Sequence, residues 1–288
     1  MKDLQCLQST ALKQNRVFAP AQTNPLKSMK INWLQLSFGL VFVVLTGFMA
    51  ALIGGLFVYG KGDFLAVLRN PEFRFALLFT LWTSVTATLL AALIAIPAGY
   101  VLSRQRFPGK ALIETLMDIP IVLPPLVSGV ALLILLGPVL GEVLTRFSLD
   151  VVFSARGVVV AQCFIATPFA IRAFKQAFDS IDPRLEKVAR TLGFSQGMVF
   201  LKVTLPLAKG CILSGLTMTW ARALGEFGAT AILAGITRMK TETLSVAIFL
   251  NMSIGDIQFA MSVSMIMLFL ALLLMSLFKF FTSSEVSQ

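Results

Sequence analysis

The sequence predicts an all-α, polytopic membrane protein with six transmembrane helices. Hydrophobic residues make up 57% of the 288 residues and charged residues only 13%, whereas a soluble domain usually carries about 25% charged residues. The mean hydropathy is +0.86. Six separate segments each approach the roughly 20 apolar residues that a helix needs to cross the hydrocarbon core of a bilayer. So few polar side chains could not cover a water-facing surface.

The six segments define the expected domain organisation. Residues 1–33 form an N-terminal tail, 34–281 the six-span domain with a long loop at 179–206, and 282–288 a C-terminal tail. The expected spans are Leu34–Tyr59, Phe75–Leu102, Leu112–Gly137, Gly157–Phe178, Ala208–Gly235 and Ile257–Phe280. The fourth span has few uncharged residues, so Arg172 and Lys175 near its end are expected to extend toward the lipid headgroups.

The basic residues predict the orientation. Most of the 24 lysines and arginines fall in segments that are cytoplasmic when both termini lie in the cytoplasm, and the positive-inside rule favours this arrangement. The first 30 residues lack an apolar region followed by a small-residue cleavage site, so a cleaved signal peptide is not expected. A cytoplasmic tail is the simpler interpretation, and an organellar transit peptide is the alternative.

The residue inventory argues against an enzyme. Histidine is absent, and Cys6, Cys163 and Cys211 are isolated, so no metal site, disulfide framework or nucleophile–base pair is predicted. Gly55–Lys61 has the spacing of a phosphate-binding loop, but Gly62 stands where Ser or Thr is required. We therefore expect no cofactor and no ATP site in this chain. The net charge of +10 fits cytoplasmic loops rather than nucleic-acid binding.

Prolines interrupt the third span. Asp118 is followed by Pro120, Pro124 and Pro125, and each proline removes a backbone donor and disfavours a straight helix. A broken helix at membrane depth is tolerated where it packs in protein or lines a cavity. Two interpretations stay open: a kink that serves packing, and a break that lines a translocation path.

The fifth span contains two opposite charges, Arg222 and Glu226. An ionisable group at the bilayer centre costs about 2.5–3.5 kcal/mol on insertion scales, so such groups are usually paired and face inward. Their spacing of four residues lets them pair on one helical face, and Gly225 and Gly228 permit close backbone approach. The pair either locks helix packing or borders the translocation path.

The loop at 179–206 predicts two short helices. Asp182 followed by Pro183 is a helix start, Gly193 supplies a stop, and Ser195 can cap a second segment that ends near Leu205. Apolar residues recur at helical spacing in the first segment; they are Leu185, Val188, Ala189 and Leu192. Such a face could lie in the headgroup layer or insert into a partner's groove.

This loop resembles the EAA loop of ABC importer permeases. The family pattern is Glu-Ala-Ala, three residues, Gly, nine residues, Ile, one residue and Leu-Pro. The residues that match it in register are Ala189, Gly193, Leu205 and Pro206. Lys187 and Val188 depart from the Glu and the first Ala. The resemblance assigns ATPase docking to Leu185, Glu186, Val188, Ala189, Leu192, Gly193, Leu205 and Pro206.

A second resemblance concerns the substrate. Ala221–Ala229 resembles the fifth-span signature of the molybdate/tungstate branch of these permeases, to which the sulfate branch is the nearest relative. Arg106–Lys110 and the proline-rich third span also resemble that branch. The resemblance covers about 70–280 and leaves the N-terminal tail outside.

The resemblance implies a type I ABC importer permease fold in a bacterial or archaeal cytoplasmic membrane. The implied partners are a second permease copy, in a homodimer, two ATP-binding subunits and an extracytoplasmic oxyanion-binding protein. The partner subunits hydrolyse ATP, and the permease itself is not an enzyme. By the same resemblance, the loop is expected to act as a coupling helix that transmits ATP-driven closure to the spans.

The alternative from another class is an ion-coupled secondary transporter. In that hypothesis Glu226, Arg222, Asp118 and Glu114 form a proton relay across the membrane. The loop discriminates between the two hypotheses, because an ion-coupled carrier has no need of an amphipathic docking hairpin.

Overall fold

The computed structural model describes residues 33–59 and 64–286, and these residues form helices without a strand. The chain divides into two compact units, Met1–Ile53 and Gly54–Gln288. Five of the described helices are long and apolar enough to cross a membrane, and a sharply bent pair makes a sixth when it is counted as one span. The all-α, six-span prediction is confirmed. The expected N-terminal tail, apart from its last residue, and Cys6 lie outside the described residues.

Helix α2, Trp33–Tyr59, is the first predicted span. It is 27 residues long and contains no proline and no charged residue, so nothing in its sequence interrupts the helix. At a rise of about 1.5 Å per residue, the helix is long enough to cross the hydrocarbon core of a bilayer.

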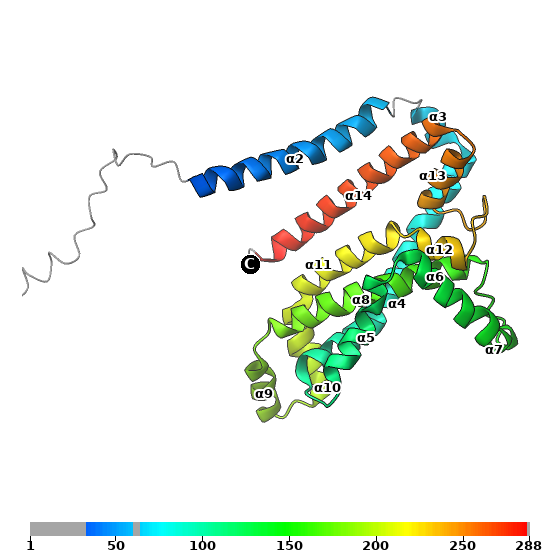
Figure 1. The fold of residues 1–288 in the computed structure, drawn as a ribbon. Helices are drawn as coiled ribbons and strands as arrows, with labels where there is room; N and C mark the ends of the chain where they lie inside the picture. Colours follow the sequence, from blue (N-terminus) through cyan, green and yellow to red (C-terminus); the bar gives the residue numbers. More distant parts are fainter. Residues whose placement is uncertain (1–32, 60–63, 287–288) are drawn as a thin grey trace, which may run out of the picture. The chain divides into compact units, whose positions relative to one another are not determined.

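In the second unit, three helices lie alongside one another: α4, Pro71–Arg104; α8, Ala155–Asp179; and α11, Leu205–Leu224 (Figure 1). Small side chains allow their close approach. Every fourth residue of α4 along this contact is small and buried; these residues are Ala87, Ala91, Ala95 and Gly99. A Cβ atom on Gly99 would lie 2.9 Å from the backbone nitrogen of Lys175 on α8.

Capping residues set where α4 and α8 begin. The Asn70 side chain accepts a hydrogen bond from the Glu72 N–H at 2.8 Å, and Pro71 occupies the first turn. The Ser154 hydroxyl accepts from the Gly157 N–H at 3.3 Å. Both helices therefore begin a few residues before the expected apolar boundary, because caps rather than hydropathy determine the first turn.

The shorter helices complete the second unit. They are α3, Phe64–Arg69; α7, Gly141–Arg146; and α13, Leu244–Ser253. The last helix, α14, is Ile257–Val286 and extends past the expected boundary at 281, since no glycine or proline stops it. Apolar residues of α3, α4, α13 and α14 form one buried cluster, which contains Val67, Phe73, Ala76, Leu244, Ala247 and Val263.

The third predicted span is broken rather than gently kinked. Helix α5, Lys110–Val122, and helix α6, Pro125–Ile134, meet at an angle of 111°. Leu123 and Pro124 between them have ψ angles of 136° and 137°, because each precedes a proline, which disfavours the helical conformation for the residue before it. A π-helical turn, η1, Leu135–Val139, follows α6.

The fifth predicted span, Ala208–Gly235, was wrong at both ends. Helix α11 is preceded without interruption by α10, Gln196–Val199, and by the π-helical turn η2, Phe200–Thr204. It ends at Leu224, and a separate short helix, α12, Gly228–Leu233, follows. The missed break has no proline to announce it. At this break the Glu226 carboxylate accepts a hydrogen bond from the Ala229 N–H.

The two broken segments pack against each other. A Cβ atom on Gly228 would lie 2.9 Å from Cβ of Pro125, at the start of α6. A Cβ atom on Gly129 of α6 would lie 2.9 Å from Cα of Ala229. A buried apolar cluster of α6, α8 and α12 surrounds this contact and contains Leu132, Ala161, Ile165, Ala229 and Leu233. Glycine is required at Gly129 and Gly228 because the facing segments lie so close that an added Cβ atom would clash.

We predict that Gly129→Ala destabilises the protein by about 1–3 kcal/mol, the usual cost of overpacking a close contact. The matched control is Gly210→Ala in α11, where no heavy atom lies within 4 Å of the added Cβ and helix propensity favours alanine. Thermal unfolding in detergent measures both. Equal melting temperatures for the two variants would contradict the predicted contact.

Candidate functional site

The helix predicted in the long loop is present. Helix α9, Pro183–Thr191, begins where the Asp182 side chain accepts a hydrogen bond from the Arg184 N–H at 2.9 Å. It ends before Gly193, whose φ of +90° is in the left-handed region that favours glycine. The Ser195 hydroxyl caps the next helix by accepting from the Met198 N–H at 3.4 Å. Local capping residues thus separate α9 from α10, as the sequence predicted.

Helix α9 presents an apolar face to its surroundings. Leu185, Val188 and Leu192 are 48%, 57% and 73% exposed, although each is a residue type that usually lies inside a protein. Leucines and valines so exposed, on a helix outside the long spans, form a candidate docking face. We call Leu185, Val188 and Leu192 the α9 apolar face.

The other residues assigned to ATPase docking do not all share this face. Gly193 and Pro206 are exposed, and Leu205 is half-buried at the start of α11. Ala189 is buried, and the Glu186 side chain is only 13% exposed. Glu186 and Ala189 therefore face the protein's own helices. Their docking role stays a prediction, and the structure gives it less support than it gives the α9 apolar face.

The pair predicted in the fifth span forms at the α11–α12 break. Arg222 Nη1 lies 2.7 Å from Glu226 Oε2. The other carboxylate oxygen, Oε1, accepts a hydrogen bond from the Ala229 N–H at 2.8 Å. Glu226 lies beyond the end of α11 rather than on its face, and it is 1% exposed. The arginine also lies 5.8 Å from the centre of the Phe169 ring. Both charges are thus satisfied within the protein.

A second group of charges joins α5 to α8. Arg172 donates two hydrogen bonds of 2.7 Å to the carboxylate of Asp118. Lys175 lies 3.6 Å from Glu114 and 3.5 Å from Asp179. The expectation that Arg172 and Lys175 extend toward the headgroups stays a prediction, and the structure adds a carboxylate partner on the neighbouring helix for Arg172. The Arg172 side chain nevertheless remains 59% exposed.

The structure does not assemble the proposed proton relay. Glu226 pairs with Arg222, whereas Asp118 pairs with Arg172. No hydrogen bond of the described residues joins one pair to the other. Glu226 and Asp118 are each neutralised by an arginine and Glu114 lies near Lys175, so the Glu226 pair is separate from the charges of α5 and α8. The secondary-transporter hypothesis gains no support.

A third polar group lies at the start of α4, at the opposite end of that helix from α9. Arg238 pairs with Glu72 at 2.9 Å, and Asn251 donates to Glu72 at 3.0 Å. Glu242 is buried and accepts from the Met239 N–H at 2.8 Å, but its Oε1 has no donor. Burial, and after it the neighbouring Glu72 carboxylate, raises the pKa of Glu242 to about 7. Sequence reasoning missed this group, since Glu72 lies far from Arg238, Glu242 and Asn251 in the chain.

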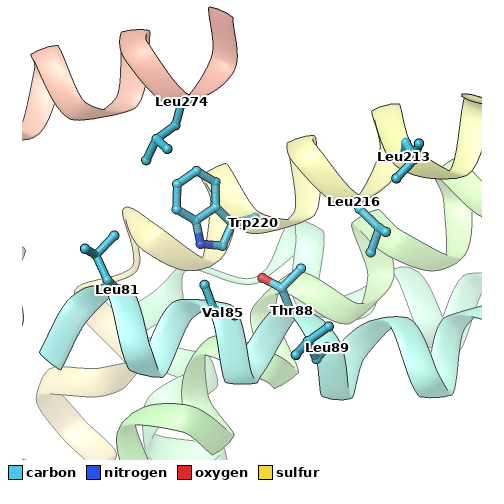
Figure 2. A pocket seen from close by; sticks show the side chains of 8 residues that line it. All are labelled: Leu81, Val85, Thr88, Leu89, Leu213, Leu216, Trp220 and Leu274. Atoms are coloured by element: carbon cyan, nitrogen blue, oxygen red, sulfur yellow. The ribbon is translucent and has the colours of Figure 1, made fainter. Parts of the chain in front are cut away.

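An apolar pocket of about 460 Å³ lies between α4, α11 and α14. Figure 2 shows Trp220 at its centre, with aliphatic side chains from the three helices around it. The Trp220 ring nitrogen donates to the Ser84 hydroxyl at 3.0 Å. The lining residues are Leu81, Val85, Thr88, Leu89, Leu213, Leu216, Trp220 and Leu274. With no charged lining residue, the pocket does not suit an anion.

The described residues offer no arrangement for metal chemistry. Within 33–59 and 64–286, no group of three His, Cys, Asp or Glu side chains could hold a metal ion. Cys163 lies 3.7 Å from the Thr167 hydroxyl, and Cys211 is exposed. What the arrangement provides is an exposed apolar face on α9 and charges that are paired within the protein.

Comparison with known proteins identifies the family. The family described as the inner membrane component of binding-protein-dependent transport systems matches residues 92–284. The chain belongs to this family. The matched region contains α9, both helix breaks and the charge pairs of α5 and α8.

Two relatives in this family have names that state the anion they transport. The molybdate/tungstate transport system permease protein WtpB of Thermococcus kodakarensis is 41% identical over 58% of this chain and 63% of the relative. The sulfate transport system permease protein CysT of Escherichia coli is 32% identical over 84% of this chain and 89% of the relative. The chain therefore spans less than two thirds of the first relative and most of the second.

Two of the solved structures that resemble the chain are structures of ABC transporters. A bacterial ABC transporter involved in alginate import matches with a TM-score of 0.72 and 17% identity, over 88% of this chain and 96% of the other. A MetNI methionine ABC transporter in an inward-facing conformation matches with a TM-score of 0.57 and 18% identity, over 72% and 92%. At such identities the likeness supports the fold alone, and the type I importer fold is confirmed.

We predict that the Arg222–Glu226 pair behaves as one energetic unit. Removing either partner leaves the other charge unpaired in the membrane, which costs about 3–5 kcal/mol for a buried pair. Arg222→Ala and Glu226→Ala should each lower the melting temperature in detergent. The double variant should lose less than the sum of the two losses. Strict additivity would show that the two side chains do not stabilise each other.

We also predict that Glu242 makes stability depend on pH. Its folded-state pKa of about 7 lies above its ordinary value of 4.5. The stabilising effect is therefore complete below the ordinary pKa and is lost as the pH rises through the folded pKa. The melting temperature of the wild type should fall, relative to that of Glu242→Gln, between about pH 5 and pH 8. Parallel pH curves for the two proteins would contradict this.

Proposed function

We propose that this chain is the membrane subunit of an ATP-driven importer for a tetrahedral oxyanion. Family membership supports an importer permease, and the names of the relatives support an oxyanion. Molybdate or tungstate ranks before sulfate because the WtpB relative has the higher identity over its matched region. The pattern of Ala221–Ala229 favours the same order.

The observation that carries the proposal is the exposed α9 apolar face. Its three side chains project from a helix that is capped at its start and stopped by Gly193 at its end. A rigid, amphipathic helix of this kind fits a groove on a partner protein. In this proposal the partner is an ATP-binding subunit, and the α9 apolar face inserts into its surface. ATP is bound and hydrolysed there, and this chain binds no cofactor.

The remaining partners follow from the same assignment. Two copies of this chain form the membrane part, each with one ATP-binding subunit at α9, and an extracytoplasmic binding protein delivers the anion. The α9 end of the bundle and both termini lie in the cytoplasm, in agreement with the distribution of basic residues. Closure of the ATP-binding subunits moves the two α9 helices and alternates access to the anion path.

The charge pairs suit an anion path that must not retain its cargo. Arg222 and Arg172 would attract a divalent oxyanion strongly if they were unpaired. Glu226 and Asp118 neutralise them at 2.7 Å. In this proposal the Arg222–Glu226 pair holds the α11–α12 break in place against α6, and selection of the anion is left to the binding protein.

The test is capture of the ATP-binding subunit by the detergent-solubilised protein. We expect Val188→Asp to abolish capture and transport, because a carboxylate on the α9 apolar face would have to be desolvated in the partner's groove. Membrane insertion should not change, since Val188 is exposed and outside the spans. The matched control is Lys187→Asp, which places the same carboxylate on an exposed position of α9 away from the α9 apolar face.

Capture of the ATP-binding subunit by Val188→Asp at the wild-type level would refute the docking face. Failure of the wild type to capture any ATP-binding subunit would refute the importer assignment. Uptake of molybdate by the assembled complex in liposomes, in the presence of excess sulfate, then decides the order of the two anions.

A further inference from the structure

Glu186 is held by three donors from other elements. Its Oε1 accepts from Arg104 Nε at 2.8 Å and from the Thr204 hydroxyl at 3.0 Å. Its Oε2 accepts from the Tyr100 hydroxyl at 3.2 Å. Tyr100 and Arg104 belong to the end of α4, and Thr204 to η2 at the start of α11. One carboxylate of α9 thus joins two membrane spans.

Arg104 extends the connection to a third span. Its Nη2 donates to the Ile181 carbonyl at 3.1 Å, between α8 and α9. Its Nη1 donates to the Ser103 hydroxyl at 3.0 Å, and that hydroxyl donates to Asp179 at the end of α8 at 2.6 Å. The ends of α4 and α8 are therefore fixed to each other and to the segment that leads into α9.

An aromatic layer lies beside this polar group. The Tyr100 ring makes edge contacts with Phe178 of α8 and Phe200 of η2, with ring centres 5.6 Å and 4.9 Å apart. Phe178 is fully buried. The side chains of Arg104 and Glu186 are only 11% and 13% exposed, so water competes little for their hydrogen bonds and the charge pair is stronger than a surface pair.

Helix α9 has few other attachments of its own. Ala189 is its one buried residue, and its larger apolar side chains belong to the exposed α9 apolar face. A methyl group buries too little area to fix the direction of a helix. The orientation of α9 relative to the spans therefore depends on the hydrogen bonds that Glu186 accepts.

We propose that Glu186 is a positioning residue that fixes α9 to the ends of α4 and α11, so that displacement of α9 by a partner moves these spans as one body. The inference rests on the proposed function and adds the contacts through which ATP-driven movement of α9 reaches the spans. Without the Glu186 carboxylate, α9 still docks on its partner. It then tilts about its ends, at Pro183 and Gly193, and the spans move less than α9.

The experiment uses the complete complex of this chain with its ATP-binding subunits and binding protein in liposomes. Three variants are compared: Glu186→Ala, which removes all three acceptor contacts; Glu186→Gln, which keeps one acceptor oxygen; and Lys187→Ala, an exposed control on the same helix. The measurements are capture of the ATP-binding subunit, and molybdate or sulfate transported per ATP hydrolysed, whichever anion the wild type carries.

For Glu186→Ala we expect capture within about twofold of wild type, because the α9 apolar face is unchanged. We expect anion transported per ATP to fall at least about fivefold, the lower end of usual coupling between sites. Glu186→Gln should restore part of this loss, and Lys187→Ala should match the wild type. A role in folding alone would lower capture, transport and ATP hydrolysis together and would leave their ratio unchanged.

A distance measurement tests the rigid connection directly. Spin labels at positions 106 and 187, both exposed, are introduced after the three native cysteines are replaced by alanine. The wild-type distance should be the same before and after ATP binding, and the Glu186→Gln distribution should broaden or shift. This measurement needs only the Gln variant, so it decides the inference even if Glu186→Ala does not fold.

Three outcomes would overturn the inference. They are an unchanged ratio of anion to ATP in folded Glu186→Ala, a selective loss of capture by that variant, and equal distance distributions in the wild type and Glu186→Gln. Selective loss of capture would place Glu186 in the docking surface instead. Failure of the wild type itself to capture an ATP-binding subunit would refute the proposed function, and the distance measurement would still report on the connection.

Discussion

Charges inside the membrane must be paired, and this constraint shapes most of the structure. An unpaired ionisable group costs at least about 2.5–3.5 kcal/mol at the centre of a bilayer, and the chain has several such groups in its spans. Arg172 pairs with Asp118 across α5 and α8, and Arg222 with Glu226 at the α11–α12 break. Each pair requires that two particular segments lie side by side. The charged residues therefore determine which segments lie next to each other. The apolar residues around them determine only that a segment is buried in lipid or protein.

One of the two helix breaks depends on the same pairing. The break after α5 is predictable from the sequence, because Pro124 and Pro125 exclude a continuous helix. The break after α11 has no proline. It is stabilised by Glu226, whose carboxylate accepts from the Ala229 N–H at the start of α12 and also holds Arg222. A charge that would be costly in a straight span thus satisfies a backbone donor that the break leaves free.

The sequence predicted the spans and the loop well because both are local. Hydropathy identifies a run of apolar residues, and Asp182, Pro183 and Gly193 bound α9 by capping rules that need no distant partner. The Arg222–Glu226 pair was also predictable, since its members are four residues apart. The end of α11, the pairing of Arg172 and the inward direction of Glu186 were not. Each depends on a residue of another helix, and periodicity says only which face is apolar. Glu186 is an example: its neighbours in sequence lie on an exposed helix, whereas the arginine that turns it inward, Arg104, is on α4.

In the proposed function, helix α9 must meet two requirements that a single face could not meet. A docking surface must be exposed and apolar before the partner arrives, so it cannot also hold the helix to its own subunit. Leu185, Val188 and Leu192 meet the first requirement. The second falls to a polar side chain on another face, because a buried charge pair fixes direction through hydrogen-bond geometry while an apolar contact permits sliding. Glu186 occupies that face, with donors from the ends of α4 and α11. In the proposed coupling, a helix attached in this way transmits movement through its hydrogen bonds to the spans, whereas a helix attached only by Ala189 would turn under the same force.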